Sequence, residues 1–137
     1  MFELFINEEK TTKILHDSTR RVIMLKFSGS VKVVDYKHSM ELILKLAKEY
    51  QYHKVIFDLS DAESTPAIGR AWFVTQFGPR AYREIGNMIV CMLLSKRSAF
   101  QNKASELVVK SMQALKLNIT ISFEEDLDAA LESMAQS

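Results

Sequence analysis

The sequence predicts an α/β protein with a mixed, mainly parallel central sheet and four helices. Three observations lead to this prediction. Apolar and polar residues alternate near the N-terminus, which is typical of antiparallel strands with one face in solvent. Two later runs, at 54–59 and 88–94, are almost continuously apolar, as expected of strands covered on both faces. Amphipathic segments separate these runs, and such alternation implies right-handed crossovers and parallel pairing.

The N-terminal part predicts a meander of antiparallel strands at 2–7, 13–16 and 22–27. Polar turns at 8–12 and 17–20 separate the three strands. We expect the meander to form one edge of the sheet. An exposed edge of this kind could pair with a second copy of the chain, so a homodimer is one expectation.

The first helix follows from a change of period. After residue 30, apolar residues recur at the spacing of one helix face. Asp35 is the predicted N-cap, because its side chain can accept a hydrogen bond from the first turn. The inner face of this helix comprises Tyr36, Met40, Ile43, Leu44 and Ala47.

The second helix is predicted to begin near Thr65. Pro66 would take the first helical position, where its missing N–H costs nothing. The Gly-Pro pair at 78–79 is predicted to end this helix. A short helical turn at 80–85 would then lead to the next strand.

The third helix is predicted to start at Ser98, which has the spacing of a capping box with Gln101. Asn118 is its predicted end. A last strand at 119–123 leads to a final helix, for which Ser122 and Glu125 offer another capping box. The predicted inner face of the third helix comprises Phe100, Ala104, Leu107, Val108, Met112 and Leu115.

The composition indicates one globular domain that spans residues 1–137. The chain is 47% hydrophobic and 26% charged, and its net charge of +1 argues against a large nucleic-acid interface. No apolar run approaches the roughly 20 residues of a membrane span. The first residues lack the features of a signal peptide. Because the single Cys91 cannot form an internal disulfide, we expect a reducing, cytoplasmic environment.

Several segments together resemble the STAS fold of anti-sigma-factor antagonists and sulfate-transporter tails, and more closely the SpoIIAA-like family of STAS-related bacterial proteins. The matching segments are a strand that leads to glycine at 27–29, a strand ending in Asp-Leu at 55–59, the aromatic pair at 72–73, the buried strand at 89–92 and the acidic closing helix at 122–131. The resemblance implies the same α/β fold over most of the chain.

The resemblance also implies two kinds of function. Antagonists of the STAS type carry a phosphorylatable serine in an Asp-Ser-x-Gly turn, whereas residues 64–69 here read Ser-Thr-Pro-Ala-Ile-Gly and lack the Asp-Ser pair. Some SpoIIAA-like relatives resemble CRAL-TRIO lipid-binding domains, which implies that a lipophilic ligand is an alternative to a protein partner.

The end of the strand at 54–59 is the first candidate site, because ligands dock where strands of an open α/β sheet end. Asp58, Ser60 and Asp61 lie there. The two carboxylates could hold Mg²⁺, but a hard cation requires more than two oxygen ligands. Solvated loop acids in an Asx-type turn are the simpler interpretation.

Ser64 and Thr65 follow at the predicted helix start. A phosphate on either hydroxyl would meet free N–H groups and the positive end of the helix dipole. The simpler interpretation is that one of them is the N-cap.

The segment that follows the strand at 88–94 supplies Lys96, Arg97 and Ser98. Two cations beside a capped helix start would suit an anionic group on a ligand or partner. A solvated basic loop with a serine cap is the alternative.

Trp72 and Phe73 are adjacent on the second helix, so they cannot both lie on one inner stripe. They predict either an aromatic partner surface, or the mouth of an apolar pocket together with Phe77 and Phe100, or a broad buried face.

No catalytic signature is present. The sequence contains no glycine-rich phosphate loop, nucleophile elbow or H-E-x-x-H motif, and its three histidines lack metal-ligand spacing. We therefore expect no enzyme activity, no catalytic residues, no cofactor and no bound metal. The leading expectation is a regulatory or protein-interaction module. Ser64 and Thr65 are the positions at which its activity could be modulated. A carrier of a small lipophilic ligand comes second, and a Mg²⁺-dependent enzyme that uses Asp58 and Asp61 comes last.

Overall fold

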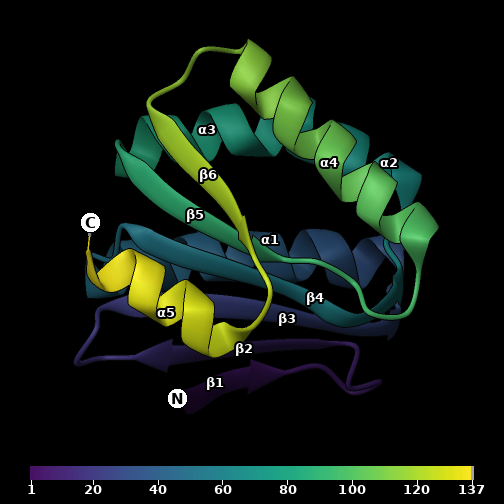
Figure 1. Cartoon of the computed structure of the whole chain (residues 1–137), viewed down its shortest axis with the longest axis horizontal. Coiled ribbons are helices and arrows are strands. Elements are labelled where there is room, and N and C mark those ends of the chain that lie inside the picture. The colour runs from purple at the N-terminus through teal and green to yellow at the C-terminus, as the bar shows by residue number, and fades with distance from the viewer. Residues whose placement is uncertain (137) are drawn as a thin grey trace.

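A six-stranded mixed sheet organises the computed structural model, which describes residues 1–136 (Figure 1). The strands lie side by side in chain order: β1 (Phe2–Ile6), β2 (Thr12–Asp17), β3 (Val22–Ser30), β4 (Lys54–Ser64), β5 (Met88–Leu93) and β6 (Ile119–Glu124). The first three strands pair antiparallel, and β3 to β6 pair parallel. The predicted mainly parallel sheet with an N-terminal meander is therefore confirmed.

The helices cover both faces of the sheet. Three of them pack on one face: α1 (Val33–Tyr50), a second helix made of α2 (Ala67–Trp72), η1 (Phe73–Phe77) and α3 (Gly78–Ile85), and α4 (Ala99–Ala114). The fourth, α5 (Leu127–Ala135), packs on the opposite face. In Figure 1, α5 lies in front of the strands and α1 behind them. Over residues 1–136, none of these helices has the length and apolar character needed to cross a bilayer.

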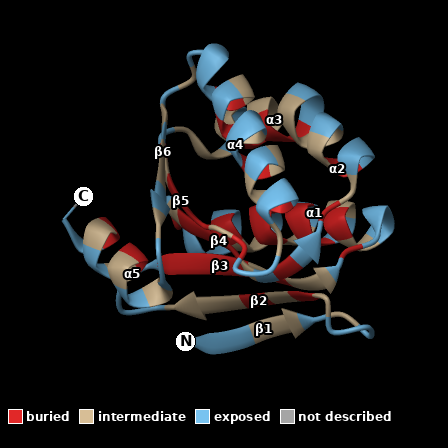
Figure 2. Cartoon of the chain, turned by 45° about the vertical axis from the view of Figure 1, so that its right-hand side comes forward, coloured by how far each residue is buried: buried red, intermediate tan, exposed pale blue. Residues whose placement is uncertain are grey.

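Two separate apolar clusters result from this arrangement, because alternate residues of a strand point to opposite faces. Ile23 and Leu25 of β3 join the large cluster under α1, α3 and α4. Val22 and Met24 join a small cluster under α5. The burial colours of Figure 2 show the central strands as the most buried part of the sheet.

The strand predicted at 54–59 continues to Ser64. The prediction that Asp58 to Thr65 form a loop is therefore wrong. The extension pairs with the end of β3, where Ser28 lies opposite Asp61 and Ser30 opposite Ser64. Two register shifts interrupt this ladder. Gly29 lies between them with a φ of 66°, a left-handed conformation that glycine adopts without strain.

The predicted break at 78–79 is also wrong. The helix passes through this pair, and its preceding turn, η1, is π-helical. Pro79 has no N–H to donate and its ring needs room over the preceding turn. The wider π-helical turn ends one residue before Gly78, which explains why the helix continues.

Three predicted helix ends shift. The N-cap of α1 is Lys32 and not Asp35, and that of α5 is Asp126, whose side chain accepts from the N–H of Ala129 at 2.8 Å. Ser122 therefore does not cap α5. The helix α4 ends at Ala114, before the predicted Asn118.

The inner face of α4 differs from the prediction. Gln101, Ser105, Val109 and Met112 are buried, whereas Phe100 and Leu107 are 74% and 65% exposed. The helix is turned because Gln101 and Ser105 form hydrogen bonds in the interior, which hydrophobic periodicity cannot anticipate.

Candidate functional site

The carboxyl ends of β4 and β5 lie together, as expected for neighbouring parallel strands. The segment after β5 folds against the extension of β4. The N–H of Lys96 donates to the carbonyl of Ser60 at 3.0 Å, and the hydroxyl of Ser95 donates to the carbonyl of Ala62 at 2.6 Å. Arg97 and Glu63 form an ion pair at 2.8 Å. These contacts bring the two predicted candidate segments into one edge of the sheet.

The candidate residues nevertheless divide between the two faces of that edge. Asp58, Ser60 and Lys96 line a depression of about 340 Å³ beside α5, together with apolar side chains such as Leu127. Thr65 and Phe73 line an apolar cavity on the opposite face. The sequence predicted that these residues form one working surface. In the structure they form two sites, one on each face of the same edge of the sheet.

Asp58 and Asp61 are joined by a lysine that sequence reasoning did not select. The Lys26 ammonium lies 2.9 Å from Asp61 Oδ2 and 3.9 Å from Asp58 Oδ2. The hydrogen bond from Lys26 lowers the pKa of Asp61, and the same bond raises the pKa of Lys26. Asp58 is buried, and its Oδ1 accepts from the N–H and hydroxyl of Ser60 at 2.9 and 2.6 Å.

This network does not fit the magnesium hypothesis. Lys26 already supplies the positive charge between the two carboxylates, so a divalent cation would have to compete with it. Within residues 1–136, no group of three or more histidine, cysteine, aspartate or glutamate side chains is placed to hold a metal. The arrangement is that of an ion-pair network at the sheet edge.

Thr65 is buried and links α2 to α4. Its N–H and hydroxyl donate to Gln101 Oε1 at 2.8 and 3.0 Å, and Gln101 Nε2 donates to the hydroxyl of Ser105 at 3.1 Å. Arg70 Nη1 donates to the carbonyl and to the hydroxyl oxygen of Thr65. The sequence prediction gave Gln101 only the role of capping-box partner of Ser98 and did not select Arg70, because polar residues on a helix give no sign of burial.

Ser64 is exposed at the end of β4. The N-cap position of α2 belongs to Pro66, and no side chain caps this helix. The interpretation of Ser64 or Thr65 as an N-cap is therefore wrong, and so is the placement of Pro66 at the first helical position.

Ser98 is the N-cap of α4, as predicted, because its hydroxyl accepts from the N–H of Gln101 at 3.1 Å. The reciprocal half of the predicted capping box does not form. The side chain of Gln101 turns to Thr65, and the N–H of Ser98 donates to the hydroxyl of Ser95 instead. Lys96 is exposed beside this cap.

Trp72 and Phe73 are both half-buried and both point toward other aromatic rings. Phe73 packs edge-on against Phe57, with ring centroids 6.0 Å apart, and Trp72 packs against Phe77 at 5.1 Å. The Lys37 ammonium lies over the outer side of the Trp72 ring, 5.5 Å from its centroid. A broad buried face describes these residues better than an exposed aromatic surface.

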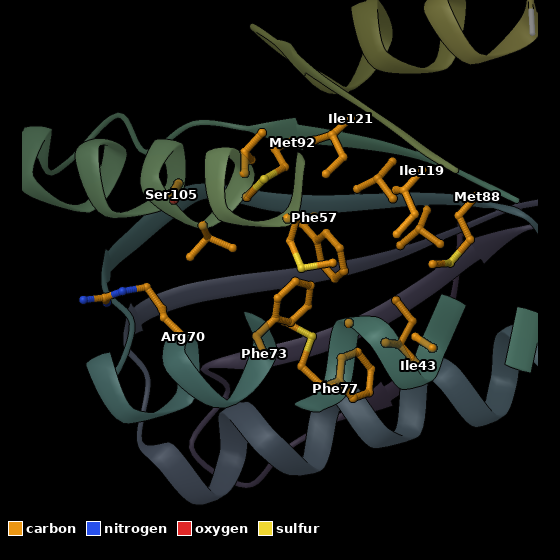
Figure 3. A pocket seen from close by; sticks show the side chains of 18 of the residues that line it. Ile43, Phe57, Arg70, Phe73, Phe77, Met88, Met92, Ser105, Ile119 and Ile121 are labelled. Carbon is orange, nitrogen blue, oxygen red and sulfur yellow. The ribbon is translucent and has the colours of Figure 1, made fainter. Parts of the chain in front are cut away.

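An apolar cavity of about 90 Å³ lies between the sheet and the three helices of this face (Figure 3). Phe57, Phe73 and Phe77 gather at its centre in this view. The predicted contribution of Phe100 is wrong, because that side chain is on the outer face of α4. Four methionines also line it, and methionine side chains adapt their shape readily: Met40, Met88, Met92 and Met112.

Cys91 is buried under α5, and this burial raises the pKa of its thiol to about 11. Such a thiol is a weak nucleophile at neutral pH, in agreement with the predicted core role. His16 belongs to an aromatic group in which its Nδ1 lies 3.0 Å from the hydroxyl of Tyr52.

No protein-family model matches the sequence, and no curated protein matches it. Several solved structures are similar, three of them as follows. An uncharacterized protein with a SpoIIAA-like fold from Shewanella loihica is 16% identical, with a TM-score of 0.59 over 90% of this chain and 91% of the other. An anti-sigma factor antagonist from Mycobacterium paratuberculosis is 16% identical, with a TM-score of 0.54 over 95% and 98%. The anti-sigma factor antagonist SpoIIAA in its unphosphorylated form is 10% identical, with a TM-score of 0.51 over 92% and 98%. The predicted resemblance is thus confirmed at the level of architecture: this chain has the SpoIIAA-like fold.

Proposed function

We propose that the chain is a non-enzymatic, STAS-type regulatory module that works by docking another protein, and that residues 1–137 form one such domain. Two proteins that share its fold are anti-sigma factor antagonists, which by that name act on another protein. The polar residues at the sheet edge are engaged in ion pairs and hydrogen bonds, which supports a binding role over a catalytic one.

Three exposed apolar side chains support this proposal. Ile68, in the first turn of α2, is 71% exposed, and Phe100, in the first turn of α4, is 74% exposed. The hydrogen bonds between Thr65 and Gln101 hold these two turns together. Leu107 is seven residues after Phe100, on the same side of α4. We call Ile68, Phe100 and Leu107 the docking face, because clustered exposed apolar groups mark interaction surfaces.

Charged groups border the docking face. Arg97 and Glu63 form their ion pair close to the start of α4, and both side chains are exposed. Apolar anchors with a charged rim are typical of protein interfaces. The partner we propose is therefore a protein with an apolar patch, and not a nucleic acid.

We propose that Ser64 is the site at which a phosphoryl group modulates docking. Its exposed hydroxyl precedes the buried Thr65, and a phosphoryl group there would add negative charge beside Glu63 and Arg97. The hydroxyl of Thr65 is less suited, because phosphorylation would displace Gln101 and Arg70.

Affinity capture followed by quantitative mass spectrometry tests the docking face. We expect Phe100→Asp to reduce recovery of the partner on the order of tenfold or more, because it removes a central anchor. Leu115→Asp is the matched control, since Leu115 is also exposed but lies at the C-cap of α4, at the far end of the helix from Phe100 and outside the docking face. If every captured protein is recovered equally with the two variants, the docking face is not the interface.

A second candidate function is the binding of a small lipophilic ligand, and the apolar cavity of about 90 Å³ favours it. Dry apolar cavities in proteins bind neutral atoms and molecules such as xenon. We expect xenon to enter this cavity and to shift the methyl NMR signals of Met92 and Ile121, which line it. Unchanged methyl signals under xenon pressure would rule out this function.

A further inference from the structure

The sheet has two free edges, and only one of them is protected against further pairing. β1 and β6 are the outermost strands. A free edge presents unpaired N–H and C=O groups to any chain that can extend along it. The ladder between β1 and β2 has a register shift between Glu3 and Phe5, and Glu3 forms an ion pair with Lys13 at 3.7 Å. A bulge and charged side chains hinder the addition of another strand to β1.

β6 has none of these protective features. Its ladder with β5 runs from Ile119 to Glu124 without a register shift. Residues 119–123 include no charged residue and no proline. Figure 2 shows β6 on the outer side of β5. The edge formed by β6 is therefore open to a further strand.

The side chains of β6 are also incompletely covered. None of its six residues is buried, whereas five of the six residues of β5 are. The helix α4 packs mainly against β4 and η1, which leaves Ile119 and Ile121 half-buried and Phe123 38% exposed. These three side chains share one face of the strand. A neighbouring strand with similar side chains would cover them from the side.

The charges at the two ends of β6 select the occupant and its orientation. Lys116 is exposed just before the strand, and Glu124 and Glu125 follow at its end. Among residues 1–136, none of these three forms an ion pair. A second copy of β6 in antiparallel orientation brings the lysine of each chain toward the acidic end of the other. Parallel pairing would instead bring the two acidic ends together, which is unfavourable.

We propose that β6 pairs with β6 of a second copy of this chain, in antiparallel orientation and centred on Ile121. In this register Ile119 of each copy lies opposite Phe123 of the other, and Thr120 lies opposite Ser122. Pairs of aromatic with β-branched residues and pairs of hydroxyl residues both stabilise antiparallel strands. Because the same surface is used by both copies, the contact closes on itself and produces a dimer.

The dimer would place both docking faces on one side. Antiparallel pairing along an edge continues the sheet and keeps its two faces distinct. The layer of α1, α3 and α4 therefore lies on the same side in both copies. A partner with two matching sites would bind the dimer more tightly than a single copy, by avidity. This consequence rests on the proposed function, whereas the pairing of the two strands does not.

Sedimentation velocity of the full chain over a range of concentrations tests the proposal. We expect a monomer–dimer equilibrium that Thr120→Lys weakens by about tenfold or more, because a lysine on an edge strand opposes strand addition. Thr120 is exposed, so this substitution spares the core of the monomer. Thr19→Lys is the matched control, since Thr19 is exposed in the turn between β2 and β3 and the change of charge is the same.

An exchange of charges tests the orientation. Lys116→Glu should weaken the dimer by about fivefold, because it brings like charges together at both ends of the paired strands. Adding Glu125→Lys should restore the affinity. In parallel pairing Lys116 would face its own counterpart, so Lys116→Glu would have little effect and the antiparallel assignment would be wrong.

Two results would overturn the proposal as a whole. One is a monomer at every concentration. The other is a dimer that Thr120→Lys and Phe123→Lys both leave intact; if Phe2→Lys dissociates it, the contact lies on β1, where Phe2 is 69% exposed. Should Thr120→Lys fail to fold, Phe123→Lys decides. Because no partner protein enters these measurements, their outcome is independent of whether the docking face is correct.

Discussion

Replacing Gln101 with leucine tests the polar link between α2 and α4. Gln101 is 2% exposed, and its side chain accepts two hydrogen bonds from Thr65 and donates one to Ser105. Leucine has a similar volume, so the substitution removes the hydrogen bonds without opening a large cavity. The hydroxyls of Thr65 and Ser105 can rotate toward other acceptors, because hydroxyl rotors adjust to their surroundings.

The backbone N–H of Thr65 cannot adjust in this way, so its loss sets the magnitude. A buried donor left without a partner costs about 1–3 kcal/mol. We therefore expect Gln101→Leu to lower the free energy of unfolding by about 2 kcal/mol, a large fraction of the stability of a domain of this size. Lys103→Ala, at an exposed position of the same helix, should change it by less than about 0.5 kcal/mol.

Urea denaturation followed by circular dichroism measures both variants. The wild type and the two variants should share one m-value, so that differences in midpoint report stability alone. A loss in Gln101→Leu as small as that in Lys103→Ala would show that the Thr65 N–H does not depend on Gln101. The reasoning about the α2–α4 link would then be refuted.

Two further predictions concern the other face of the sheet. Because the hydrogen bond from Lys26 lowers the pKa of Asp61 in the folded state below its ordinary value, the carboxylate stabilises the fold at neutral pH, and this contribution is lost as the pH falls through the lowered pKa. Asp61→Asn should therefore lower the free energy of unfolding by less than about 1 kcal/mol at pH 7, since the side chain is half exposed. At a pH below the lowered pKa of Asp61 the substitution should have no effect. Urea denaturation at both pH values measures this difference. An equal cost at both pH values would contradict this. Met134→Ala removes a buried side chain of α5 that packs in the cluster of Cys91, so reaction of Cys91 with a thiol reagent should accelerate by about tenfold or more. An unchanged rate would show that α5 does not shield Cys91.

The alternation of strands and helices was predictable because each element carries its own periodicity. Local patterns were enough to predict the two buried strands that begin at residues 54 and 88. They were also enough to predict the helix face that includes Tyr36 and Ala47. The extension of β4 to Ser64 was not predictable, because it depends on pairing with the end of β3. That pairing joins residues about 34 positions apart in sequence, such as Ser30 and Ser64. It also requires two register shifts in the ladder between β3 and β4.

The candidate site was predictable in its location but not in its geometry. The adjacency of Ser60 and Lys96 follows from parallel neighbours whose carboxyl ends meet. The pairing of Asp61 with Lys26 involves a strand far away in sequence. The burial of Gln101 turns α4 by about one residue and exposes Phe100, because hydrogen bonds in the interior outweigh the apolar stripe.

The position of α5 has a practical consequence for immobilisation. The docking face belongs to α2 and α4, whereas α5 covers the reverse side of the strands with its own small cluster around Met134 and Cys91 (Figure 1). A biotin or affinity tag attached beyond Ala135 therefore orients the molecule with Ile68 and Phe100 away from the support. Surface-based measurements should use this attachment, because tethering through α4 would hide the face under test.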